Sequence, residues 1–420
     1  MERFDDICLA SDDILLPAAG VDMSKWAVVA CDQFTSEPEY WQEAAETAGD
    51  APSTLRLIYP EAFLGEKDGD KRVNAINAAM RQYLDDGIIV PAVHGFILTE
   101  RECIHGLRAG LIAAVDLEKY DFSVGSKSPI RATEGTILSR IPPRVKIREH
   151  ASIELPHIMM LIDDAMRTVI EPLYEMRESL RGLYDFDLMQ GGGHIRGWAV
   201  EGEAADFVVS AMRALREKCP DIFLAVGDGN HSLATARQCW LNMRDSLTPE
   251  ERENHPARYA LCEIVNLHSE ALVFEPIHRV LQGADMCEVI RDFGSWCERG
   301  GMHMERGARD GQVFRFVNAQ SDMSVTVTGA REPLDLGTLQ SFLDEWMHLH
   351  PDASIDYVHG EDSVRHICEQ SGACGILLRP MDKSDLFPAV ERRGALPRKT
   401  FSMGEAREKR YYLECRKIEG

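Results

Sequence analysis

The sequence predicts a protein of mixed α+β class with two regions. Apolar runs of strand length occur together with amphipathic helical segments, and the early strands follow one another without helices between them. From about residue 282 onward, short strands and helices alternate over a second stretch of chain. We therefore expect an α+β core in residues 1–282 and a C-terminal α+β region in residues 283–420.

The composition indicates a globular protein that carries a large negative charge. The 420 residues include 46 Lys and Arg against 69 Asp and Glu, which gives a net charge of −23. Such a field repels polyanions and argues against nucleic acid as a partner. The N-terminus has no secretory signal pattern and no stretch reaches membrane-spanning length, so we expect a cytoplasmic protein without a membrane partner. Eleven scattered cysteines without zinc-ligand spacing indicate reduced thiols.

The elements of the first region can be taken in order. Residues 26–31 have strand character and end at Asp32, which places this carboxylate at the mouth of a strand. An Asx turn is an equally good explanation of Asp32. A helix follows from residue 36 and a second one over residues 70–86, with apolar residues at helical spacing. Further strands are expected at residues 88–93, 95–98 and 106–117.

An arginine-rich segment covers residues 130–149, IRATEGTILSRIPPRVKIRE. Its basic residues are Arg131, Arg140, Arg144, Lys146 and Arg148. Guanidinium groups bind phosphate oxygens bidentately, so the segment is a candidate clamp for a phosphorylated ligand. Pro142 and Pro143 indicate a turn or extended backbone there. Solvated surface charge is the alternative explanation.

The next segments predict mostly core elements. Residues 156–182 read as a helix broken at Pro172, with methionines as core filler. Three glycines then precede His194 and Arg196, and a hairpin tip explains them better than a second anion site does. A helix over residues 203–219 follows. In the second region we expect a hairpin of residues 313–317 and 324–328, helices over 336–347, 363–370 and 384–391, and strands at 354–358 and 375–378.

Residues 222–237, IFLAVGDGNHSLATAR, form the most informative stretch. An apolar strand ends in a glycine turn, and a helix follows at once. A helix that opens from such a turn points backbone N–H groups and its positive dipole end at one spot, where phosphate or carboxylate binds. Gly227 and Gly229 allow a close backbone approach, and His231 adds a donor that can move a proton. A plain turn with Asn230 or Ser232 as N-cap is the alternative.

The chain resembles domain-of-unknown-function family 1015, which is often labelled ParB-like. The resemblance runs through Cys31-Asp32-Gln33, residues 131–144, 227–236 and 258–276, and Leu396-Pro397-Arg398-Lys399-Thr400. Its most specific motif, Asp228-Gly229-Asn230-His231-Ser232, is similar to the family's Asp-Gly-His-His-Arg. A similar turn and helix start binds nucleotide phosphates in the ParB and sulfiredoxin superfamily. Ser232 departs from that pattern. The phosphate contact of the missing arginine would come from Arg131, Arg144 or Arg237, or it is absent.

This resemblance implies a ParB/sulfiredoxin-like core that binds ATP or ADP, with CTP as a further candidate, together with Mg²⁺. It implies transfer of phosphate to a small hydroxyl metabolite such as free serine. The implied site residues form two groups. Phosphate would be bound by Gly227, Gly229, Asn230, His231, Ser232, Arg131 and Arg144, and the catalytic residues would be Glu134, Asp228 and His231, with Asp228 also as metal ligand. Secondary candidates are Asp32, His194 and Arg237.

Two other functions fit the same residues. One is a nucleotide-responsive, ParB-like regulatory or DNA-associated protein, against which the net charge counts. The other is a metal-dependent hydrolase that uses His231, His194 and Asp32 or Asp228, although no known ligand spacing supports it. The acceptor, the nucleotide preference and homo-oligomerisation stay open.

Overall fold

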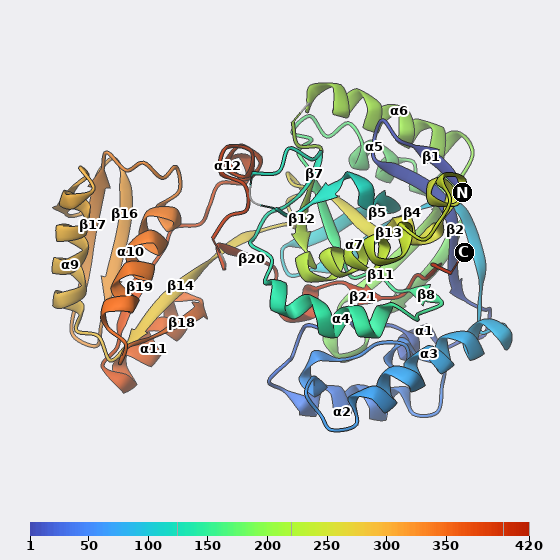
Figure 1. Ribbon diagram of the computed structural model, residues 1–420, viewed down its shortest axis with the longest axis horizontal. Coiled ribbons are helices and arrows are strands. Elements are labelled where there is room, and N and C mark those ends of the chain that lie inside the picture. Colours follow the sequence, from blue (N-terminus) through green and yellow to red (C-terminus); the bar gives the residue numbers. More distant parts are fainter. Residues whose placement is uncertain (124, 220, 398, 420) are drawn as a thin grey trace. The chain divides into compact units, whose positions relative to one another are not determined.

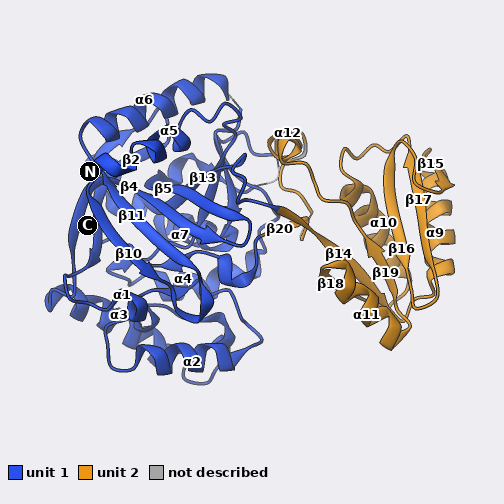
Figure 2. Cartoon of the chain, turned by 180° about the vertical axis from the view of Figure 1, so that it is seen from behind, with its two compact units in different colours: residues 1–273, 404–420 blue, residues 274–403 orange. Residues whose placement is uncertain are grey.

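The computed structural model describes residues 1–123, 125–219, 221–397 and 399–419, and the chain forms two compact units (Figure 2). Unit 1 comprises residues 1–273 and 404–420, and unit 2 comprises residues 274–403. The expected mixed α+β class is confirmed. The units do not divide at residues 282 and 283, because β14 (Phe274–Gln282) pairs with strands of unit 2 and the end of the chain returns to unit 1.

Unit 1 is built on an 11-stranded mixed sheet (Figure 1). Most neighbours are antiparallel, as the sequence predicts for the early strands, but β12 lies parallel to β7, β13 to β9 and β6 to β7. The strands, in spatial order, are β10 (Gly182–Asp187), β11 (His194–Val200), β4 (Ile89–Cys103), β2 (Leu9–Pro17), β5 (Gly106–Asp116), β13 (Tyr259–Asn266), β9 (Met159–Ile162), β12 (Leu224–Asp228), β7 (Ile130–Ala132) and β6 (Tyr120–Asp121), with β1 (Glu2–Phe4) beside β2.

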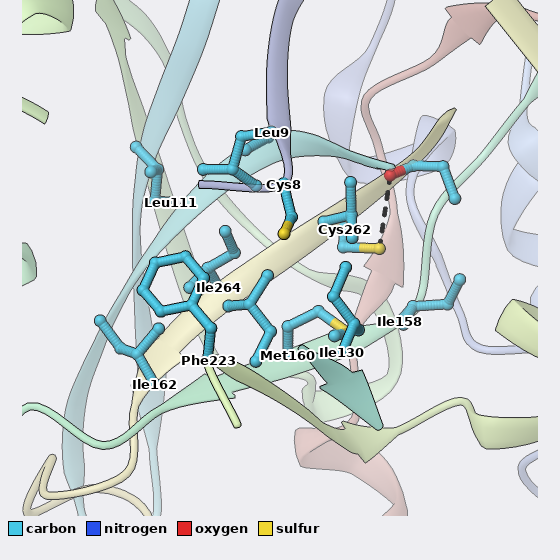
Figure 3. Close-up of a cluster of buried hydrophobic side chains, with 14 of the residues drawn as sticks. Cys8, Leu9, Leu111, Ile130, Ile158, Met160, Ile162, Phe223, Cys262 and Ile264 are labelled. Carbon is cyan, nitrogen blue, oxygen red and sulfur yellow. Dashed lines mark hydrogen bonds between the residues drawn. The ribbon is translucent and has the colours of Figure 1, made fainter. Parts of the chain in front are cut away.

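Both faces of this sheet are buried, and the alternation of side chains along its strands explains how. Phe96 and Leu98 belong to one core, whereas Ile97 between them belongs to the other. Helices α5 (Ile170–Glu175), α6 (Glu203–Lys218) and α7 (Asn230–Arg244) contribute to the first core, part of which is drawn in Figure 3. Helices α2 (Pro38–Ala48) and α3 (Gly69–Asp85) contribute to the second.

The end of the chain is an integral part of unit 1. Strand β21 (Tyr411–Tyr412) pairs with β3 (Val28–Val29), and β22 (Arg416–Lys417) pairs with β8 (Ile153–Glu154). Directly before β21, buried Arg410 forms ion pairs with Glu263 and Glu414. Breaking a buried pair leaves an uncompensated charge, which costs about 3–5 kcal/mol. The final segment is therefore fixed in place by these contacts.

Two local expectations were wrong. Residues 156–182 do not form one helix, because Met159 and Met160 lie in strand β9, and the helical part consists of α5 and one 3-10 turn at residues 177–179. A short apolar run does not distinguish a buried strand from a buried helix. Pro142 and Pro143 lie in the first turn of helix α4 (Ile141–Arg148). Backbone N–H groups in the first turn make no intrahelical hydrogen bond, so proline, which has no N–H, is tolerated there.

Unit 2 has a sheet in the order β15 (His303–Arg306), β17 (Asp322–Thr328), β16 (Gln312–Val317), β19 (Cys374–Leu377), β14 and β18 (Ser354–His359), with β20 (Phe401–Met403) beside β14. Helices α9 (Met286–Arg299) and α10 (Asp335–Leu349) share one core with it, and α11 (Glu361–Ser371) shares another. The expected hairpin and helices of this region are confirmed, the last helix being α12 (Leu386–Arg393).

The remaining helices are short. They are α1 (Met23–Trp26), α8 (Pro249–Asn254) and the 3-10 helices Thr54–Arg56, Glu61–Phe63, Leu117–Lys119, Leu138–Arg140, Arg177–Ser179, Met189–Gly191, Pro256–Arg258, Lys383–Asp385 and Ala406–Glu408. Among the described residues, no helix has both the length and the apolar character that crossing a bilayer demands.

Candidate functional site

The turn between β12 and α7 has the strand–turn–helix form that the sequence predicts. Gly229 is the N-cap of α7 with φ 80° and ψ 28°, in the left-handed region. A Cβ atom there would lie 3.1 Å from Cα of Ile158, so the position needs glycine for space as well as for conformation. Because glycine offers no capping side chain, the first N–H groups of α7 and its positive dipole end remain available to an anion.

A loop beside the turn is held in place by two hydrogen bonds. Thr133 Oγ1 donates to the carbonyl of Val226 at 2.6 Å, and the backbone N–H of Ile137 donates to Nε2 of His231 at 3.2 Å. Burial and the charges of Arg144 and Arg140 lower the pKa of His231 to about 4. His231 is therefore neutral at pH 7 and positions the loop, which carries half-buried Glu134.

Ser232 is the last member of a series of hydrogen-bonded side chains, and the first member is Tyr412 in the C-terminal segment. The Tyr412 hydroxyl accepts the N–H of Cys31 at 3.2 Å and lies 2.7 Å from Nδ1 of His157. Nε2 of His157 lies 2.9 Å from Ser232 Oγ. Because Tyr412 accepts from a backbone donor, its own hydrogen is best directed at Nδ1, which favours a proton on Nε2. His157 then donates to Ser232, whose hydroxyl hydrogen is left to donate to a ligand.

Two carboxylates lie at the turn in different electrostatic settings. Asp228 accepts the N–H of Gly229 at 3.0 Å with one oxygen, and its other oxygen lies 3.3 Å from Nζ of Lys409. Asp32 follows strand β3, with 30% of its side chain exposed and Oδ2 3.9 Å from Nε2 of His157. Burial opposes its ionisation, but His157, a hydrogen bond from Gln33 and the charge of Lys409 hold the pKa of Asp32 below its usual range.

Arg144 is the predicted arginine that the fold brings to this region. It lies on α4, forms an ion pair with Glu61, and donates to the carbonyl of Arg140 at 2.7 Å. Both arginines lie close enough to His231 to depress its pKa. The neighbouring basic residues of α4 point to other partners, since Arg148 binds Glu154 and Lys146 binds Asp70.

Other predicted residues have different surroundings. Arg131 is buried and donates to the carbonyls of Ser128 and Asp221, at the opposite end of β12 from the turn. Arg237 lies over the ring of Phe122, 5.9 Å from its centroid. Both ring nitrogens of His194 lie 2.6 Å from carboxylates, those of Asp185 and Asp187, in the predicted β10–β11 hairpin.

The last two predicted phosphate-binding residues lie at the turn itself. Gly227 is in β12, and Asn230 is the first residue of α7. Asn230 Oδ1 is buried and has no hydrogen-bond partner within the described part of the chain. The turn therefore combines Gly227, Asp228, Gly229, Asn230, His231 and Ser232 with Asp32 and Arg144.

Three side chains of types that can bind a metal ion lie together in unit 2. Ligand atoms of Glu288, Asp292 and His350 lie within 4.8 Å of one another. Arg291 contacts both carboxylates, so these acids already have a cationic partner. At the site beside α7, the carboxylate of Asp32 is 30% exposed and could contribute a metal ligand.

Sequence reasoning missed the residues that complete the site from distant segments. These are His157, Tyr412, Lys409 and Glu61. His157 follows Pro156 in an unremarkable stretch, and no local pattern marks it. Tyr411 and Tyr412 next to charged residues near the end of the chain were the available signal, since buried aromatics make a disordered tail implausible.

Comparisons with solved structures give matches of low sequence identity and low TM-score. No curated protein matches the chain. A free serine kinase in complex with AMP is 12% identical, with a TM-score of 0.38 over 73% of this chain and 91% of that one. A conserved hypothetical protein from Pyrococcus furiosus is 11% identical, with a TM-score of 0.36 over 73% and 95%. Truncated SbnI from Staphylococcus aureus is 9% identical, with a TM-score of 0.37 over 70% and 82%.

The family profile described as Protein of unknown function (DUF1015) matches residues 15–346, which includes the turn, Asp32, His157 and Arg144. The broader ParB-like grouping stays a prediction. Since the match covers most of the sequence, the chain belongs to the DUF1015 family.

Proposed function

We propose that the protein binds a nucleotide with its phosphates at the N-terminal end of α7 and transfers the terminal phosphate to a hydroxyl group of a small molecule. The main support for this proposal is the surroundings of the N-terminus of α7. This helix begins after Gly229, and Lys409, Arg144 and the acidic Asp32 lie near its first turn. The Asp228–Ser232 motif resemblance supports a nucleotide as the source of phosphate.

Each group has a distinct task in this proposal. The N–H groups at the start of α7 donate to phosphate oxygens, and Lys409 and Arg144 neutralise their charge. The Ser232 hydroxyl donates in place of the arginine of the family motif, because His157 occupies its acceptor side. Positioning and charge neutralisation of this kind supply most of the catalysis in phosphoryl transfer.

In the transfer step, every bond and proton can be assigned to a group at this site. The acceptor oxygen forms a bond to the terminal phosphorus, and the bond from that phosphorus to its bridging oxygen breaks. The nucleotide leaves one phosphate shorter, and the hydroxyl proton passes to Asp32. One oxygen of each aspartate accepts a hydrogen bond, but Oδ2 of Asp228 lies 3.3 Å from the ammonium of Lys409, whereas Oδ2 of Asp32 lies 3.9 Å from Nε2 of His157, so Asp32 suits this role better. Glu134, in the adjacent loop, is the alternative base.

The residues present fit Mg²⁺ at Asp32. Mg²⁺ takes one or two carboxylates together with substrate phosphates and water, and Asp32 is a partly exposed carboxylate with a lowered pKa. When bound, Mg²⁺ would neutralise phosphate charge that builds up during transfer. Lys409 keeps Asp228 engaged, which leaves Asp32 as the residue that would hold the ion.

Calorimetric titration with ATP, ADP and CTP, with and without Mg²⁺, tests nucleotide binding. Lys409→Met should weaken binding about 10- to 100-fold, because a hydrogen bond to a charged group contributes roughly 1.5–3 kcal/mol. Lys417→Met, an exposed position on β22, is the matched control and should bind as the unaltered protein does. No binding of any of the three nucleotides would reject the proposal.

Phosphorus NMR with a panel of hydroxyl compounds tests the transfer. A new phosphomonoester signal that requires both nucleotide and acceptor is the expected result. Nucleotide binding without transfer to any acceptor would instead favour the nucleotide-responsive regulatory protein. For a DNA-associated role, a gel shift at low salt is the sensitive measurement, since electrostatic binding is strongest there.

A further inference from the structure

An apolar cavity of about 140 Å³ adjoins the site in unit 1. Ser232, His157 and Tyr412 line one part of it, and Glu61 and Arg144 line another. The remaining walls are mostly hydrocarbon, and four of the apolar residues are almost completely buried. These are Leu57, Met80, Ile153 and Leu261.

Apart from the Ser232 hydroxyl hydrogen, polar groups deep in the cavity wall have partners within the protein. Glu154 accepts hydrogen bonds from Leu261 N and Arg416 Nε, both at 2.8 Å, and binds Arg148 with its other oxygen. Thr235 Oγ1 donates to the carbonyl of His231 at 2.7 Å. A water molecule inside would therefore find few of the two to four partners that it needs. The cavity favours hydrocarbon over water or a free anion.

The volume sets the size of the group that fits. In another protein, an enclosed cavity of about 150 Å³ with aliphatic and aromatic walls binds benzene. The cavity here has a similar volume and is partly open to solvent. Serine, the acceptor expected from the family resemblance, has a side chain of one carbon and one oxygen, which would leave most of the space empty. A phenyl ring or a branched chain of about six carbons fills it.

We propose that this cavity receives an uncharged hydrocarbon group of the phosphate acceptor, the size of a phenyl ring, and holds the acceptor hydroxyl beside Ser232. The inference rests on the proposed function and specifies its substrate class as an apolar alcohol or phenol. Specificity follows from burial, because moving a ring of this size from water into the cavity strengthens binding roughly 30-fold or more.

The first test uses the full-length protein without nucleotide and two hydroxyl probes. Benzyl alcohol should bind saturably with a Kd on the order of 1 mM, by calorimetry or ligand-observed NMR. Glycerol, which has hydroxyl groups but no ring, should bind at least about 30-fold more weakly. Equal affinity for the two probes, or no binding of benzyl alcohol, would overturn the inference.

Two variants locate the probe in the cavity. Ala151→Phe fills the space from its wall and should weaken benzyl alcohol binding about tenfold or more, whereas Ala78→Phe, on the exposed side of α3, should not. Met80→Ala enlarges the cavity and should admit 2-naphthylmethanol, which the unaltered protein excludes. Equal losses in Ala151→Phe and Ala78→Phe, or naphthylmethanol binding to the unaltered protein, would contradict the assignment.

The outcomes separate this inference from the proposed function. Binding of benzyl alcohol without binding of any nucleotide would leave an apolar ligand site and reject phosphate transfer. Nucleotide binding with transfer to serine or glycerol, and no preference for benzyl alcohol, would support transfer and reject the apolar acceptor.

Discussion

The hydroxyl oxygen of Tyr412 lies 2.7 Å from Nδ1 of His157, although the two residues are 255 positions apart in the sequence. The rings also meet edge to face, with centroids 5.3 Å apart. This contact joins the returning end of the chain to the segment before β9. It orients the imidazole that hydrogen-bonds to Ser232.

Tyr412→Phe should lower both stability and nucleotide affinity. The substitution leaves the N–H of Cys31 and Nδ1 of His157 without their partner, which costs about 1–3 kcal/mol for each buried group left unsatisfied. Urea unfolding and calorimetric titration measure the two effects. Tyr357→Phe, whose residue is 39% exposed, is the control and should change neither. A Tyr412→Phe protein with unchanged stability would mean that the hydroxyl does not fix His157.

Gly229→Ala should be more harmful than a glycine substitution of similar backbone conformation elsewhere. At Gly229, φ is +80° and a Cβ would lie 3.1 Å from Ile158, whereas at Gly87 φ is +67° and no atom lies within 4 Å. The left-handed conformation alone costs alanine about 1–2 kcal/mol, so Gly87→Ala measures that part. The additional loss in Gly229→Ala reports the close approach of Ile158. Equal losses of unfolding free energy would show that the contact relaxes at no cost.

A comparison of predicted and observed positions of single residues shows how far the sequence could predict the site. The strand, Gly229 and the start of α7 could be predicted, because the hydrophobic run and the glycine turn are local patterns. Arg131 and Arg144 could not be told apart, since residue type does not reveal that one guanidinium binds Ser128 and Asp221 while the other faces the site. His157 joins the site only through sheet pairing and the return of the chain end, which are long-range.

The free energy of unfolding should decrease at acidic pH because His231 is neutral in the folded protein. Its pKa in the folded protein is about 4, below the ordinary value of 6.5, so protonation favours the unfolded state. The contribution of His231 is fully present above pH 6.5 and is lost as the pH falls from 6.5 toward 4. Urea unfolding at several pH values should therefore show the stability of the unaltered protein falling relative to His231→Gln.

Glutamine can still accept the N–H of Ile137, so the comparison with His231→Gln isolates the titration from the loss of that hydrogen bond. Other groups titrate alike in both proteins and cancel in the difference. A constant difference between pH 7 and pH 4 would mean that His231 has an ordinary pKa in the folded protein.

Asp32→Asn should separate nucleotide binding from phosphate transfer. Asparagine keeps the size of the side chain but does not take up the hydroxyl proton, so the transfer rate should fall about 10²- to 10⁴-fold. Without Mg²⁺, nucleotide affinity should rise, because the carboxylate with its lowered pKa no longer repels the phosphates. Rates by phosphorus NMR and affinities by calorimetry give both numbers on one protein. Asp13→Asn, at a residue whose side chain is 62% exposed, is the control and should alter neither. If Asp32→Asn retains the full rate, the proton goes to another group, and the same pair of measurements on Glu134→Gln identifies whether that group is the carboxylate of the adjacent loop.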